Sequence, residues 1–130
     1  PAPEPPKDPI ASRGPLQAPS PRTVAIPDFV ERNLVGSREP SKISQLACGA
    51  TSTTNLVQIR EPLKEQAHAD ADALVYVVGG EGLLAMPIAD VPLAAGTFSL
   101  IPRGTTYTLQ RRGRNPLILL VTLTDTACQK

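Results

Sequence analysis

The 130-residue chain has few of the side chains on which most enzyme sites depend. It contains one histidine, two cysteines, two tyrosines, two phenylalanines and no tryptophan. Two cysteines exclude a zinc site built from four of them. The few aromatic rings argue against a carbohydrate-binding surface that works by stacking. A nucleophile activated by histidine has a single candidate base, His68, and no G-x-S-x-G turn accompanies it. We therefore predict no catalytic residues.

The chain also lacks an excess of one charge and a long apolar run. Thirteen Lys and Arg balance twelve Asp and Glu, unlike the basic surface of a nucleic-acid-binding protein, so we expect no nucleic-acid partner. The longest apolar run, Pro116–Val121, is far shorter than the roughly 20 residues of a membrane-spanning helix. The densest basic cluster, Arg111, Arg112 and Arg114 around Gly113, predicts a solvated hairpin tip, with an anion or partner patch as the alternative.

Proline, in contrast, is abundant and concentrated at one end. Residues 1–22 hold eight of the fifteen prolines and few large apolar side chains. Such a segment cannot bury enough surface to offset its ordering entropy, so we expect an extended Pro-rich arm or linker, either free or lying across the domain. The Pro/Ala-rich start resembles the tether that often follows a signal peptide. On that basis we expect an extracytoplasmic location, periplasmic or secreted.

The two cysteines, Cys48 and Cys128, are far apart in the sequence. In an exported protein they could form one disulfide that ties the C-terminal tail to an early strand. Two unpaired thiols are an equally good interpretation.

After residue 22 the composition becomes that of a folded domain, which we place at 23–130. The segment 26–36 predicts one short helix, because Phe29, Val30 and Leu34 recur at helical spacing and Pro27 stands near the start. The remaining segments predict short strands at 41–48, 51–60, 73–78, 82–88, 97–102, 105–110 and 116–124.

Turn residues separate these strands, and ADVP (89–92) and AAG (94–96) are predicted to be turns. The segment 41–48 alternates least cleanly, since Ile43 and Ala47 share one face and Leu46 falls on the other. Short strands about ten residues apart indicate an all-β sandwich or barrel.

The stretch QAHADADALVYVVGGEG (66–82) places the only histidine before a buried strand and a glycine turn. It resembles the first motif of the cupin family of small double-stranded β-barrels, G-x5-H-x-H-x3,4-E-x6-G. In this alignment His68 is the second histidine and Gln66 replaces the first. The glutamate falls on Ala73 or, with the shorter gap, on Asp72. The glycine positions fall on Arg60 and on Gly80 or Gly79.

The second cupin motif, G-x5-P-x-G-x2-H-x3-N, resembles GTFSLIPRGTTY. Gly96, Pro102 and Gly104 match, whereas the histidine falls on Tyr107 and the asparagine on Arg111. The turn residues are therefore retained, and these meet backbone requirements. The metal ligands are mostly absent. The resemblance, which covers about residues 58–124, implies a cupin-like jelly-roll barrel without the usual metal site.

Other ligand sets for a metal are unfavourable. His68, Asp70 and Asp72 have the i, i+2, i+4 spacing of one strand face, but the cupin register places Asp70 in a solvated loop, where aspartate is usually a turn former. We predict no metal and no cofactor. His68 is interpreted as a barrel-lining side chain that hydrogen-bonds Gln66 or Tyr107.

Two functions stay open on this evidence. The favoured one is a non-enzymatic module that binds a small molecule or a partner, with a pocket lined by Gln66, His68 and Tyr107. The alternative is a metal-dependent cupin enzyme, of isomerase or dioxygenase type, with an unusual ligand set. The resemblance also implies a homodimer, and the apolar run 116–123 would have one face to offer a partner subunit.

Overall fold

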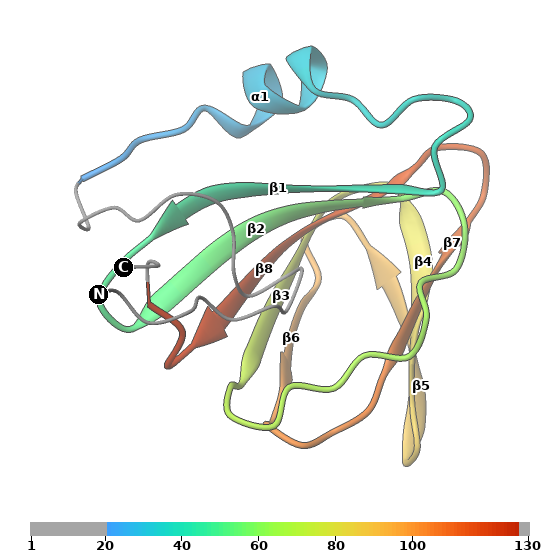
Figure 1. The fold of residues 1–130 in the computed structure, drawn as a ribbon. Coiled ribbons are helices and arrows are strands. Elements are labelled where there is room, and N and C mark those ends of the chain that lie inside the picture. The colour runs from blue at the N-terminus through green and yellow to red at the C-terminus, as the bar shows by residue number, and fades with distance from the viewer. Residues whose placement is uncertain (1–20, 128–130) are drawn as a thin grey trace.

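The computed structural model describes residues 21–127, which form one short helix and eight strands (Figure 1). Most of the predicted Pro-rich arm, residues 1–20, lies outside the described residues. The elements in chain order are α1 (Ile26–Arg32), β1 (Ser41–Cys48), β2 (Ser52–Ile59), β3 (Ala73–Gly79), β4 (Glu81–Met86), β5 (Ala89–Ala94), β6 (Phe98–Ile101), β7 (Thr108–Arg112) and β8 (Leu117–Thr124).

The strands form two antiparallel sheets that face each other. One sheet has five strands in the order β1-β2-β8-β3-β6, and the other has three in the order β5-β4-β7. The last strand, β8, is at the centre of the larger sheet. The predicted all-β class and the single short helix near the N-terminus are confirmed. Within residues 21–127, no helix is long and apolar enough to cross a membrane.

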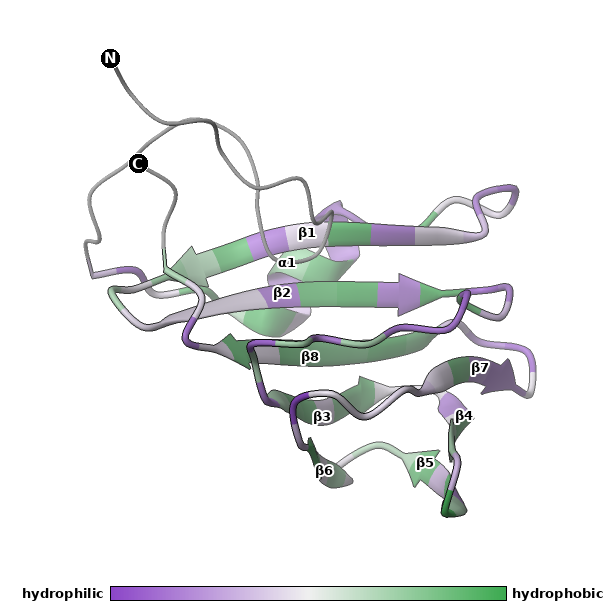
Figure 2. Cartoon of the chain, turned by 60° about the horizontal axis from the view of Figure 1, so that its bottom comes forward, coloured by the Kyte–Doolittle hydropathy of each residue, from purple (hydrophilic) through white to green (hydrophobic). Residues whose placement is uncertain are grey.

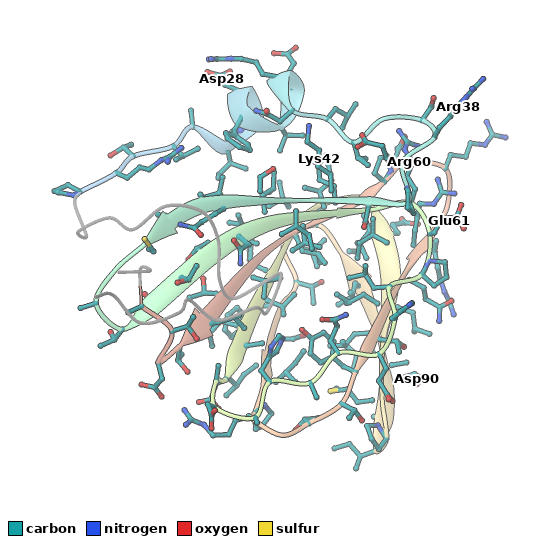
Figure 3. The ribbon with its side chains drawn as sticks, in the orientation of Figure 1. Asp28, Arg38, Lys42, Arg60, Glu61 and Asp90 are labelled. Carbon is teal, nitrogen blue, oxygen red and sulfur yellow. The ribbon has the colours of Figure 1, made fainter. Side chains whose placement is uncertain are left out.

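The main core fills the space between the two sheets. It consists of inward-facing aliphatic side chains from both, together with Tyr107, and Figure 2 shows the hydrophobic colouring along β3 and β8. Its largest fully buried members include Ile59, Leu84, Ile101, Leu117, Leu119 and Leu123. The charged side chains labelled in Figure 3 lie at the periphery, away from this core.

A second, smaller core lies on the outer face of the large sheet. Leu46, Leu56 and Ile118 are buried there, and side chains of α1 such as Phe29 and Val30 pack against them. The predicted burial of β8 on both faces is therefore correct, but α1 and its flanking residues cover the second face. The helix takes the place that we expected a partner subunit to occupy on β8.

Polar side chains of β2 fix the end of α1 on this sheet. The fully buried Gln58 accepts a hydrogen bond from the main-chain N–H of Val35 at 2.9 Å and donates one to the carbonyl of Asn33 at 2.9 Å. Arg60 donates to the carbonyls of Gly36 and Val35. Because helix ends leave main-chain groups without intrahelical partners, these bonds satisfy groups that the fold buries.

The helix is shorter than the sequence predicts. It ends at Arg32, and the side-chain amide of Asn33 donates back to the carbonyl of Phe29 at 2.9 Å. Leu34, which the helical spacing assigned to the buried face, is consequently 49% exposed, and Val35 is buried instead. Competition by asparagine for main-chain groups explains the early end.

Two other local expectations are corrected. Residues 89–92, predicted as a turn, belong to β5, and Pro92 is accommodated because β5 is an edge strand. Of the predicted turn 94–96, Ala94 ends β5, while Ala95 and Gly96 do form a turn. The cluster Arg111–Arg114 is no hairpin tip, because β7 and β8 belong to different sheets. The irregular alternation of 41–48 has a simple cause: a bulge between Gln45 and Ala47 turns Leu46 into the outer core.

Candidate functional site

The structure brings His68 and Tyr107 into direct contact inside the barrel. The imidazole Nε2 and the phenol hydroxyl are 2.9 Å apart, and the two ring centroids are 5.9 Å apart. Both side chains are buried, with exposed fractions of 8% for His68 and 2% for Tyr107. Either atom can donate in this bond, depending on the imidazole tautomer. Of the two predicted hydrogen-bond partners of His68, Gln66 and Tyr107, the structure shows the bond to Tyr107.

The connection between β2 and β3 is held against β7, and this places His68. Gln66 and Tyr107 exchange both main-chain hydrogen bonds, at 2.8 and 2.9 Å, and the N–H of Leu63 donates to the carbonyl of Leu109. The N–H of Gly104 donates to the carbonyl of His68 at 2.9 Å. The connection thus extends the three-stranded sheet by a short stretch of pairing.

Gln66 belongs to this arrangement chiefly through its main chain. Its side-chain amide donates to the carbonyl of Lys64 at 3.0 Å, in an exposed position. Of the three residues predicted to line a pocket, the structure joins the side chains of His68 and Tyr107 by a hydrogen bond and places Gln66 beside Tyr107 in the backbone ladder.

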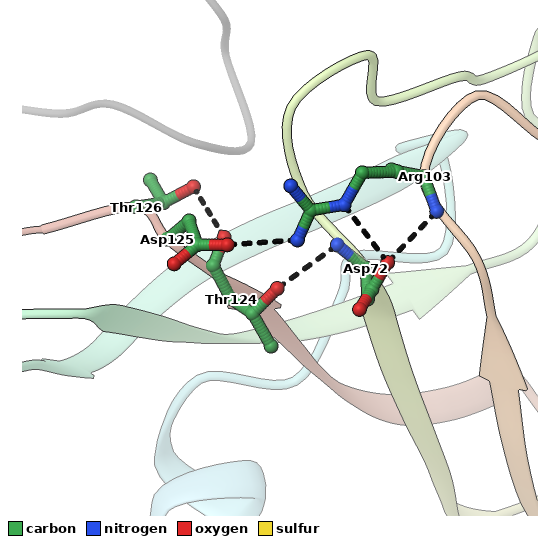
Figure 4. Close-up of polar contacts among 5 residues, drawn as sticks. All are labelled: Asp72, Arg103, Thr124, Asp125 and Thr126. Carbon is green, nitrogen blue, oxygen red and sulfur yellow. Dashed lines mark hydrogen bonds and ion pairs between the residues drawn. The ribbon is translucent and has the colours of Figure 1, made fainter.

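Asp72 is hydrogen-bonded to Arg103 at one end of the barrel, as Figure 4 shows. Its Oδ1 accepts hydrogen bonds from the main-chain N–H of Arg103 at 2.9 Å and from the Nε of Arg103 at 3.2 Å, and Nη2 of Arg103 reaches Asp125 at 2.7 Å. The main-chain N–H and then the guanidinium of Arg103 hold the pKa of Asp72 below its ordinary value of 3.8. We call Asp72, Arg103 and Asp125 the rim clamp.

The rim clamp joins three segments that are distant in sequence. Asp72 precedes β3, Arg103 follows β6 and Asp125 follows β8. The hydroxyl of Thr124 accepts a further hydrogen bond from the main-chain N–H of Asp72 at 3.0 Å (Figure 4). No motif pointed to Arg103 or Asp125, although Arg103 stands between two residues that match the second cupin motif.

The donor set at the cupin metal positions does not fit a metal ion. His68 is bonded to Tyr107, Ala73 offers no ligand atom, and the carboxylate of Asp72 is held by Arg103. A catalytic zinc or iron needs about three protein ligands. Within residues 21–127, no group of three or more His, Cys, Asp or Glu side chains is arranged to hold a metal ion.

The glycines of the two motifs have the backbone conformation that their retention predicted. Gly80, Gly96 and Gly104 all have positive φ, at 80°, 91° and 82°. At Gly80 a side chain would also collide with the main-chain carbonyl of Pro116, so two independent constraints require glycine there.

Two further predicted features have different outcomes. Arg112 and Arg114 line an open surface hollow of about 520 Å³, but Glu81 lines it too, which makes the hollow a poor anion site. Cys48 ends β1, while Cys128 lies outside the described residues, so their disulfide stays a prediction.

Comparisons with known proteins identify the fold. No sequence profile of a protein family matches the chain, and no curated protein matches it. Among solved structures, an uncharacterized protein with a double-stranded β-helix domain from Klebsiella pneumoniae is similar, with a TM-score of 0.70 at 14% identity, over 85% of this chain and 100% of that one.

Two further solved structures share this architecture. A cupin-2 domain protein from Shewanella frigidimarina has a TM-score of 0.61 at 18% identity, over 76% of this chain and 91% of that one. A predicted oxalate decarboxylase from Thermotoga maritima has a TM-score of 0.59 at 16% identity, over 65% and 79%. The chain therefore has the cupin fold, as the motif resemblance implied.

Proposed function

We propose that this protein is a non-enzymatic module with a cupin fold, which binds a small molecule or a partner without the help of a metal. The hydrogen bond between His68 Nε2 and the hydroxyl of Tyr107 carries the proposal. The one imidazole left at a cupin metal position is bonded to the phenol that replaces another ligand. A metal would have to displace Tyr107 and would find too few other donors.

The ligand region is the part of the barrel around Gln66, His68 and Tyr107. A small molecule that reaches the buried pair has to part the β2–β3 connection from the β6–β7 loop, which meet at the hydrogen bond from Gly104 to the carbonyl of His68. The buried imidazole and phenol are then the polar groups that an otherwise apolar ligand would meet there.

The alternative is a metal-dependent cupin enzyme of isomerase or dioxygenase type that uses an unusual ligand set. A predicted oxalate decarboxylase is among the solved structures of similar fold, and this supports the alternative. At 16% identity that likeness concerns the fold only.

Metal analysis separates the two. The parent protein and His68→Ala are produced in medium supplemented with manganese, iron, cobalt, nickel and zinc, and the metal content of each is measured by mass spectrometry. We expect much less than one metal per chain in both. One metal per chain in the parent, lost in His68→Ala, would establish a metal site at His68, contradict the proposal and favour the enzyme alternative.

A positive control tests whether side chains at these positions can bind a metal ion. The triple variant Gln66→His, Ala73→Glu and Tyr107→His restores the cupin ligand types and should take up one ion, with a rise in melting temperature. A folded triple variant that takes up no ion would contradict the assigned register. Because His68 is the only histidine, its imidazole nitrogens in the parent can be followed by NMR, and added zinc should leave them unchanged.

A further inference from the structure

A surface hollow lies at the end of the barrel opposite to His68 and Tyr107. Those two residues precede β3 and β7, whereas the hollow is formed where β3 passes into β4 and where β7 passes into β8, with the end of β5 beside them. Its volume of about 520 Å³ falls within the roughly 300–1,000 Å³ of small-molecule sites. The hollow is therefore a candidate binding site of its own, separate from the ligand region proposed above.

Small residues line one part of the hollow, and the main chain favours glycine at two of them. They are Gly80, Ala94, Ala95 and Gly113. Gly113 has a φ of 82°, and Gly80, with a φ of 80°, would bring any side chain against the carbonyl of Pro116. Because these residues have a short side chain or none, a small molecule has room beside them.

Charges of both signs line the other part of the hollow. Glu81 and Arg112 lie directly opposite each other in the β4–β7 ladder, so their side chains leave the same face of the sheet, with Cβ atoms about 5 Å apart. Arg114 and Asn115 line the hollow from the link between β7 and β8. Oε1 of Glu81 lies 3.8 Å from the position that a Cβ atom of Gly113 would take, so the carboxylate lies beside this link.

The turn that carries the two arginines is held by its own hydrogen bond. The guanidinium of Arg111 donates to the main-chain carbonyl of Arg114 at 2.8 Å. Within residues 21–127, the side chains of Glu81, Arg112 and Arg114 make no hydrogen bond or ion pair. An exposed ion pair between Glu81 and Arg112 would contribute little stability, so a ligand could replace it at small cost. The carboxylate and the guanidinium groups are therefore accessible to a ligand.

We propose that this hollow binds a free α-amino acid through its two charges. The carboxylate of the ligand accepts hydrogen bonds from the guanidinium of Arg112 or Arg114, whose planar fork matches a carboxylate. The ammonium group of the ligand donates to the carboxylate of Glu81. In an α-amino acid a single carbon separates the two groups, which suits protein side chains that leave neighbouring positions on one face of a sheet. The side-chain amide of Asn115 can bond a polar side chain of the ligand.

A ligand with both charges suits the hollow better than a simple ion. An anion would be attracted by the arginines and repelled by Glu81, and a cation would meet the opposite combination, so neither gains much. A zwitterion can place each of its charges beside an opposite one. Because the hollow is open to solvent and the contacts are few, we expect weak binding, with a Kd of about 1 mM.

An NMR titration of the isotope-labelled full chain with glycine tests the proposal. Glycine at up to about ten times the expected Kd should shift the amide signals of Gly80, Glu81 and Gly113 in a saturable way. Sodium acetate and methylammonium chloride each carry one of the two charges, and they should shift these signals far less at the same concentration and ionic strength. Shifts with either salt as large as those with glycine would overturn the proposal, and so would glycine that shifts none of these signals.

Variants of the charged residues assign the two halves of the ligand. The double variant Arg112→Gln, Arg114→Gln removes both partners of the carboxylate and should abolish the shifts with glycine. Glu81→Gln removes the partner of the ammonium group and the repulsion of anions. It should weaken the binding of glycine and strengthen that of acetate, so that acetate binds at least as well as glycine.

Arg38→Gln and Glu61→Gln are the matched controls, because both side chains are exposed and lie outside the hollow (Figure 3). Both variants should bind glycine as the parent does. The dispersion of the amide signals shows that each variant is folded. If Glu81→Gln keeps the preference of the parent for glycine over acetate, then Glu81 does not bind the ammonium group and the proposal is wrong.

Discussion

Replacing Gln58 by leucine should clearly destabilise the domain, although leucine is apolar and close in size. Gln58 is fully buried between α1 and the large sheet. Leucine cannot accept from the N–H of Val35 or donate to the carbonyl of Asn33. Both main-chain groups would lose their partner, and the N–H of Val35 would be left buried without one.

The magnitude follows from these two bonds. A buried main-chain group that loses its partner costs about 1–3 kcal/mol, and the gain from a more apolar side chain offsets part of this. We expect a net loss of about 2–3 kcal/mol in the free energy of unfolding. For a domain of this size that corresponds to a fall in melting temperature of roughly 10 °C.

Urea and thermal denaturation of Gln58→Leu measure this loss. Gln45→Leu is the matched control, because Gln45 is a half-buried glutamine in the neighbouring strand β1. It should cost much less. If Gln58→Leu is no less stable than Gln45→Leu, then Gln58 does not fix the end of α1 in the way described.

Three other expectations can be tested in solution. The pKa of Asp72 is lowered in the folded state, so its negative charge stabilises the protein at pH values above the ordinary pKa of 3.8. This contribution is lost as the pH falls through the folded-state pKa. The melting temperatures of the parent and Asp72→Asn should therefore differ at about pH 7 and converge near pH 2. Gly96→Ala should lower the free energy of unfolding only by the strain of positive φ, about 1 kcal/mol. Gly80→Ala should lower it further, because the new methyl group would collide with the carbonyl of Pro116. Equal unfolding free energies of the two variants would refute that collision. If Cys48 and Cys128 form a disulfide, an alkylating reagent should add two alkyl groups to the intact mass only after the protein is reduced. Alkylation of both cysteines without reductant would exclude the disulfide.

The strand pattern and the turn residues were readable in the sequence because they depend on local rules. Side-chain alternation identified most strands, and the positive φ of Gly96 and Gly104 explains why those glycines match the cupin motif. The β5 strand was missed because Pro92 is a turn signal unless the strand is known to be an edge.

The site was only partly predictable for a related reason. The alignment placed His68 and Tyr107 at converging positions, and the structure joins them. The rim clamp could not be foreseen, because Arg103 and Asp125 are brought to Asp72 by tertiary structure alone. The role of Gln58 was likewise invisible, since a glutamine within an apolar strand carries no sign of the helix end that it bonds.

The central position of β8 has a consequence for how the chain folds during synthesis. The strands on either side of it, β2 and β3, have β8 as a common partner, yet β8 is synthesised after the other seven described strands. Before it emerges, β1 and β2 can pair with each other and β3 can pair with β6, but the large sheet remains in two pieces. Closing the pairing of Thr53 with Leu123 spans most of the domain, which is a slow, non-local step. A nascent chain stalled before residue 117 should therefore expose the β2 and β3 edges together, and this is the stage at which the protein most needs protection from aggregation.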